Sequence, residues 1–116
     1  MTKAEMKFLL KRYRYLQKAI CTKKNSAFFT VSRRHERIPI DSEIIKFSNA
    51  VQKALEKADD LEKQFMELLV LEGKSDVYIF THCYVTRSSY YSFKETFLDR
   101  LFCLCIFAGL VSEDEI

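Results

Sequence analysis

The apolar spacing of residues 86–108 limits the fold more than any other feature of the chain. Thr86 stands where a helix N-cap is expected, and Gly109 stands where a helix of this length ends. Between them, apolar side chains recur at steps of three and four residues, which places them on one face of a helix: Tyr90, Phe93, Phe97, Leu101 and Leu104. The sequence therefore predicts one long amphipathic helix over this stretch.

A shorter helix is predicted immediately before it. Ser75 is its expected N-cap, it runs to about His82, and residues 83–85 form a tight turn. Two helices joined by such a turn, the second opening with small polar and basic residues, are typical of a helix-turn-helix, whose second helix enters the DNA major groove. An ordinary amphipathic hairpin with a solvated polar face would show the same spacing. The side chains expected to face the bases are Arg87, Ser88, Ser89, Tyr91 and Ser92.

Residues 85–101, VTRSSYYSFKETFLDRL, resemble the recognition helix of ArpU-family and RinA-like phage transcriptional regulators. Those regulators are similar in turn to region 4 of bacterial sigma factors. The Ser-x-Tyr-Tyr core of the family pattern is matched by residues 88–91, and the resemblance spans about residues 41–108. It implies sequence-specific DNA binding in phage or prophage transcription. Two positions depart from the pattern: Gly is usual where this chain has Tyr84, and a small residue is usual in place of Phe80.

The remaining sequence predicts further helices in a single all-α domain. Two Gly and one Pro among 116 residues, with 48% hydrophobic residues, favour long helices over a turn-rich β fold. Helices are expected over residues 3–22, 42–57 and 60–73, with a capping-box spacing at Asp59 and Glu62. Phe28, Phe29 and Val31 are expected in a short extended piece. The predicted organisation is a basic helix and loop (1–40), support helices (41–73), the helix-turn-helix (74–108) and an acidic tail (109–116).

Two of these helices have a predicted inward face. For the helix over 42–57 its apolar members are Ile44, Ile45, Phe47, Val51, Ala54 and Leu55. For the helix over 60–73 they are Leu61, Phe65, Leu68, Leu69 and Val70.

Positive charge is concentrated at the start of the chain. Residues 1–40 hold eleven Lys or Arg against two Glu, whereas residues 41–73 hold four against eight acids and residues 74–116 four against six. Such a segment is typical of a protein that binds a polyanion, although a solvated face or a membrane surface are alternatives for a basic helix. The residues expected to contact DNA phosphates are Lys7, Lys11, Arg14, Lys18, Arg33, Arg34, Arg37, Lys74 and Lys94.

The motifs in the sequence favour neither an enzyme nor a metal or cofactor site. The sequence has no Gly-rich phosphate loop and no Gly-x-Ser-x-Gly elbow. The spacing of the cysteines and histidines fits no ligand pattern, so free buried thiols in a cytoplasmic protein of a bacterial host cell are expected. No apolar run is long enough to span a membrane. The residues concerned are Cys21, Cys83, Cys103, Cys105, His35 and His82.

The sequence thus predicts a double-stranded-DNA-binding regulator of the phage type. The alternative is a phage-encoded protein-binding module on the same scaffold. Such a module would dock on RNA polymerase or inhibit a host nucleic-acid enzyme, as anti-CRISPR proteins do. A homodimer is also expected, because the C-terminal stretch is apolar on more than one face and a short chain has little core to cover it: Phe102, Leu104, Ile106, Phe107, Leu110 and Val111.

Overall fold

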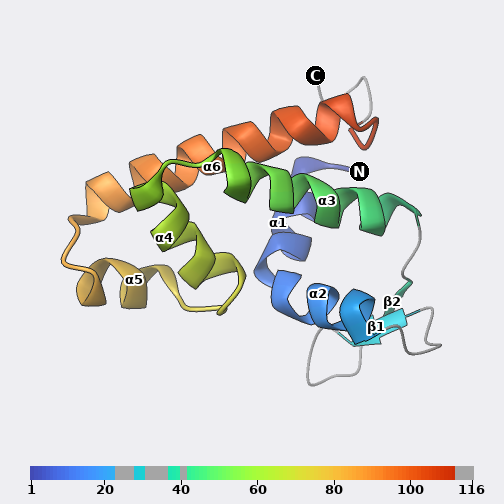
Figure 1. Cartoon of the computed structure of the whole chain (residues 1–116), viewed down its shortest axis with the longest axis horizontal. Coiled ribbons are helices and arrows are strands. Elements are labelled where there is room, and N and C mark those ends of the chain that lie inside the picture. The colour runs from blue at the N-terminus through green and yellow to red at the C-terminus, as the bar shows by residue number, and fades with distance from the viewer. Residues whose placement is uncertain (23–27, 31–36, 40–41, 112–116) are drawn as a thin grey trace.

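The protein is a small all-α domain with one short hairpin added. The computed structural model describes residues 1–22, 28–30, 37–39 and 42–111 (Figure 1). Within these residues the helices are α1 (Lys3–Lys11), α2 (Tyr13–Thr22), α3 (Ser42–Lys57), α4 (Asp60–Val70), α5 (Asp76–His82) and α6 (Arg87–Phe107). Strands β1 (Phe28–Thr30) and β2 (Arg37–Pro39) pair antiparallel, with Phe29 opposite Ile38. The extended piece expected at Phe28 and Phe29 is therefore one strand of a pair.

Helix α6 extends along the length of the molecule, and α3 and α4 pack against it (Figure 1). Helix α3 lies beside its C-terminal half, and α4 packs on its N-terminal half. The predicted apolar face of α6 is confirmed: Tyr90, Phe97 and Leu101 are buried, and Phe93 and Leu104 are half-buried. Cys105 joins this face with no exposed surface.

The predicted helix boundaries in the C-terminal half are confirmed by their caps. The Ser75 hydroxyl accepts from the Tyr78 amide at 3.1 Å, and the Thr86 hydroxyl accepts from the Ser89 amide at 3.2 Å. Both bonds satisfy amides that have no partner inside their helix. Gly109 has a φ of 74°, the left-handed conformation that ends a helix without the steric cost of a Cβ.

The prediction of one continuous helix over residues 3–22 is wrong, because the helix breaks at Arg12. The Arg12 amide bonds to the carbonyl of Leu9, and the guanidinium instead donates to the Phe8 carbonyl at 3.1 Å. The same guanidinium lies 3.7 Å from the centre of the Phe8 ring. The side chain thus satisfies a carbonyl that the backbone would bond in an unbroken helix. The break lets both short helices bury their apolar sides: Met6, Leu9 and Leu10 from α1, and Tyr13 and Leu16 from α2.

Two residues predicted to face inward are exposed. Ile45 is 44% exposed, because its side chain points away from the buried face of α3, which includes Ile44, Phe47 and Val51. Leu61 is 49% exposed, because α4 turns Glu62 inward in its place. Leu61 and Glu62 precede Phe65 by four and three residues, so either can lie on the same helix face as Phe65. The apolar pattern alone therefore favours Leu61.

Glu62 is 2% exposed and bonds across the core to α6. Its Oε1 accepts from Arg100 Nη1 at 2.8 Å. The Glu62 amide donates to the Asp59 carboxylate at 2.9 Å, so the predicted cap at Asp59 is confirmed. The carboxylate of Glu62 does not return to the cap, however, because it holds Arg100. This ion pair joins α4 to α6.

The C-terminal apolar stretch is only partly covered by the chain itself. Leu110 and Val111 are buried, but Phe107 is 89% exposed on the last turn of α6.

The described thiols differ in exposure. Cys105 is buried, and burial raises its pKa to about 11, whereas Cys103 is exposed. The expectation that the cysteines are buried is therefore wrong for Cys103. The side chain of Cys21 and the residues of the predicted acidic tail from 112 onward lie outside the described part of the chain.

We predict that Arg100→Met lowers the free energy of unfolding by about 3 kcal/mol, because it leaves the Glu62 carboxylate buried without a cation. Urea unfolding followed by circular dichroism measures the change. The control is the double variant Glu62→Met with Arg100→Met, which removes both charges and should recover most of the loss. A single variant within about 0.5 kcal/mol of wild type would show that the ion pair does not hold α4 on α6.

Candidate nucleic-acid interface

The turn between α5 and α6 contains a strained residue. Tyr84 has a φ of 55°, the one positive φ at a non-glycine position among the described residues. A side chain in this left-handed region costs about 1–2 kcal/mol, and glycine avoids that cost. The resemblance expects Gly at this position, so the backbone here has the conformation that the usual residue favours. The Tyr84 side chain gains nothing in return from the fold, because it is 97% exposed.

Phe80, the second departure from the family pattern, packs in an aromatic cluster between the helices. Its ring centroid lies 6.0 Å from that of Tyr90 and 6.4 Å from that of Tyr91. Phe65 of α4 reaches the same cluster, with its centroid 6.3 Å from Tyr90 and 5.5 Å from Phe93. Tilted and edge-on ring pairs at these separations are favourable. The large Phe80 ring is therefore accommodated by contact with α6.

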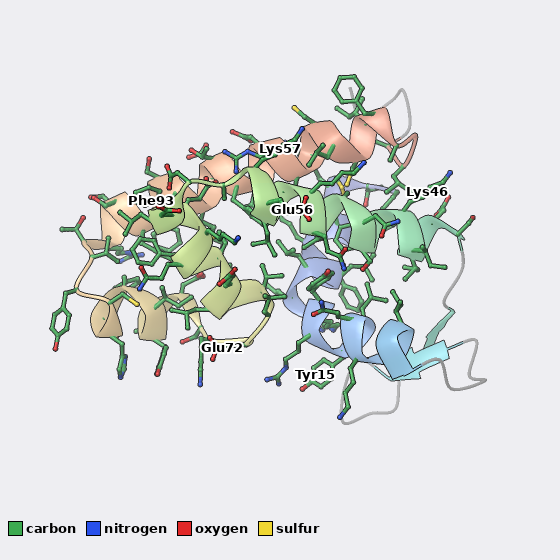
Figure 2. The ribbon with its side chains drawn as sticks, viewed as in Figure 1. Tyr15, Lys46, Glu56, Lys57, Glu72 and Phe93 are labelled. Atoms are coloured by element: carbon green, nitrogen blue, oxygen red, sulfur yellow. The ribbon has the colours of Figure 1, made fainter. Side chains whose placement is uncertain are left out.

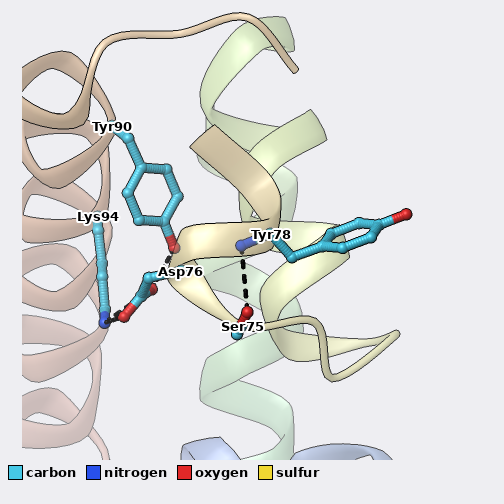
Figure 3. Close-up of polar contacts among 5 residues, drawn as sticks. All are labelled: Ser75, Asp76, Tyr78, Tyr90 and Lys94. Carbon is cyan, nitrogen blue, oxygen red and sulfur yellow. Dashed lines mark hydrogen bonds and ion pairs between the residues drawn. The ribbon is translucent and has the colours of Figure 1, made fainter. Parts of the chain in front are cut away.

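Polar contacts join the start of α5 to α6. Figure 3 shows Tyr90 and Lys94 converging on Asp76, with Ser75 capping α5 beside them. The Tyr90 hydroxyl donates to Asp76 Oδ1, and Lys94 Nζ lies 3.1 Å and 3.0 Å from the two carboxylate oxygens. Burial and the adjacent carboxylate both raise the pKa of Tyr90, so this phenol remains a neutral donor. The sequence does not single out Asp76, because no local pattern connects it to side chains 14 and 18 positions later.

All five predicted base-contacting residues are exposed on the first turns of α6, but they do not share one face. The Arg87 guanidinium lies 5.7 Å from the centre of the Tyr91 ring, a cation–π arrangement that orients both side chains. Ser92 lies one helical turn after Ser88, on the side of α6 next to the one that carries Arg87 and Tyr91. Ser89 is two residues from Tyr91 and so points away from it. Beyond the second turn, the exposed side of α6 carries two acidic residues, Glu95 and Asp99.

Four of the predicted phosphate-contacting residues gather around one cavity of about 510 Å³: Lys7, Lys11, Lys74 and Lys94. The first two come from α1 and the last two from the predicted helix-turn-helix, so the fold joins the two basic parts of the sequence. Lys94 is already paired with Asp76, whereas Lys7 and Lys11 form no ion pair with any described residue.

The other predicted phosphate contacts lie elsewhere. Arg14 Nη1 donates to the Glu72 carbonyl at 3.4 Å and its Nη2 to the Tyr15 hydroxyl at 2.6 Å. Lys18 is exposed on α2, on the far side of the break at Arg12. Arg33 and Arg34 lie outside the described residues, and only the backbone of Arg37 is described, in β2.

No three His, Cys, Asp or Glu side chains within the described ranges form a group that could hold a metal ion. None of the helices in that part of the chain is both long and apolar enough to cross a membrane.

We predict that Tyr84→Gly raises the free energy of unfolding by about 0.5–1 kcal/mol. Glycine removes the left-handed strain, and its larger unfolded-state entropy offsets part of the gain. Thermal and urea unfolding measure the change. The control is Tyr84→Ala, which keeps a Cβ and should leave stability close to wild type. An equal gain from both variants would attribute the effect to removal of the exposed ring.

A scan against protein-family models gave no match, and searches of curated proteins and of solved structures gave none either. The resemblance to phage regulators therefore remains a prediction from the residues that it matches.

Proposed function

We propose that this chain is a sequence-specific DNA-binding regulator of the phage or prophage type, with α5 and α6 as its helix-turn-helix. The observation that supports this most is the exposed start of α6. Arg87, Ser88, Tyr91 and Ser92 lie there free of the core, directly after a turn that contains a left-handed residue. The first turns of a recognition helix supply the base contacts in this class of protein.

The chemistry of these side chains suits the major groove. Arg87 forms no ion pair with a described residue, so its guanidinium can donate two hydrogen bonds to the O6 and N7 atoms of guanine. The Tyr91 ring beneath it restricts the directions that Arg87 can take. Ser88 and Ser92 carry hydroxyls that can bond to any base edge. Specificity therefore depends mainly on Arg87.

Lysines on α1 and at the start of α5 would contact the DNA backbone. Lys7, Lys11 and Lys74 add positive charge around a cavity that reaches α6 at Lys94 and Leu98, beyond its first two turns, and they are not needed for the core. Such contacts supply affinity that does not depend on sequence and weakens as salt concentration rises. Lys94 contributes less, because a phosphate would have to compete with Asp76 for its ammonium group.

A protein-binding module is the second candidate, and a specific observation favours it. The tip of the turn presents Tyr84 at 97% exposure, with Val77 of α5 at 60%. A fully exposed aromatic residue held in a strained conformation is expected where a partner protein covers it. In this candidate function the turn docks on RNA polymerase or on a host nucleic-acid enzyme, and α6 does not enter DNA.

We predict that Arg87→Ala reduces discrimination between a preferred and a random duplex by about 1–3 kcal/mol, because a bidentate contact to guanine is lost. The preferred duplex is first selected from a random pool with the wild-type protein, and fluorescence anisotropy at several salt concentrations then gives both affinities. The matched control is Lys57→Ala, which removes one exposed positive charge from α3.

The outcomes separate the candidate functions. An equal loss on both duplexes would show that Arg87 binds only phosphate. If the wild-type protein shows no DNA binding at physiological salt, the regulator is contradicted and the protein-binding module is favoured.

A further inference from the structure

The lysine-rimmed cavity has the composition of a small-molecule site. It lies between α1, the α4–α5 connection and α6, and its volume of about 510 Å³ is in the range of ligand pockets. Leu10, Leu69 and Leu98 form an apolar wall, and the four cations on its rim are all lysines. A lysine ammonium group binds phosphate as a compact point charge and does not need the planar, bidentate geometry by which arginine pairs with a carboxylate.

The positive charge around this cavity is only partly offset by nearby acids: Lys7 also borders a neighbouring cavity that Glu95 and Asp99 line. Asp76 is the carboxylate in the lining, and it already bonds to Lys94 and to the Tyr90 hydroxyl. Among the described residues, the Lys74 ammonium group lies 5.0 Å from the centre of the Tyr78 ring and pairs with no carboxylate. Lys7, Lys11 and Lys74 therefore face one cavity with no carboxylate of the described residues bonded to any of them. A bound anion would relieve their mutual repulsion.

We propose that this cavity binds a small phosphorylated molecule with an apolar or aromatic body, the chemistry of a nucleotide. The phosphates would lie against Lys7, Lys11 and Lys74, and the body against the leucine wall. A DNA duplex is too wide to enter a concave site of this size and can contact only its rim. The proposal does not depend on the regulator function, because it concerns the protein without DNA.

Isothermal titration calorimetry with ADP, pyrophosphate and adenosine tests both parts of the site. ADP is expected to bind most tightly, because pyrophosphate lacks the body and adenosine lacks the charge. The double variant Lys11→Gln with Lys74→Gln should weaken ADP binding by about ten-fold or more, because it removes two charge-assisted contacts to phosphate. The matched control is Lys46→Gln with Lys57→Gln, which removes the same charge from exposed positions on α3 (Figure 2). It should retain wild-type ADP affinity.

Each outcome decides the proposal. Absence of ADP binding by the wild-type protein overturns it, as does an equal loss of affinity in the α3 control, which would indicate diffuse attraction. If the Lys11 and Lys74 variant loses only duplex DNA binding and ADP never binds, the lysines contact backbone phosphates and the regulator function remains. ADP binding without DNA binding supports the cavity and contradicts the regulator.

Discussion

Tyr90 occupies the point where α4, α5 and α6 meet, and the placement of the candidate interface depends on it. Its ring is fully buried against Phe65 of α4 and Phe80 of α5, and its hydroxyl bonds to Asp76 at the start of α5. Truncating a buried aromatic side chain of this size costs about 3–5 kcal/mol, and the hydrogen bond avoids leaving a polar atom unpaired in the core. One residue of α6 therefore fixes α5 in both position and direction.

The exposed start of α6 is a consequence of this arrangement. With Tyr90 directed inward, Tyr91 and Ser92 must point outward, and Arg87 lies one helical turn before Tyr91. The ion pair between Glu62 and Arg100 restrains the next turns of α6 against α4. Helix α1 packs beside α4, and this contact brings Lys7 and Lys11 close to Lys74. The core thus determines which charges gather on one side of the molecule.

The sequence predicts those features that depend on local spacing. The caps at Ser75 and Thr86, the turn between them and the apolar face of α6 are all of this kind, since each involves residues within a few positions of one another. The break at Arg12 escapes prediction because a side chain, and neither Gly nor Pro, produces it. The burial of Glu62 depends on Arg100, 38 positions away, and the pairing of Asp76 with Lys94 depends on residues 18 positions apart. The lysine-rimmed cavity likewise requires the tertiary fold, although its individual lysines carry a basic signal in the sequence.

An NMR titration with duplex DNA tests the central claim, that the first two turns of α6 form the interface. Amide resonances are assigned first, and chemical shifts are then followed as a duplex bearing a selected site is added. We predict the largest shifts at residues 86–92, smaller ones at Lys7, Lys11 and Lys74, and little change along α3. Shifts confined to α5 and Tyr84, shifts on α3 alone, or no shifts at saturating DNA would contradict it.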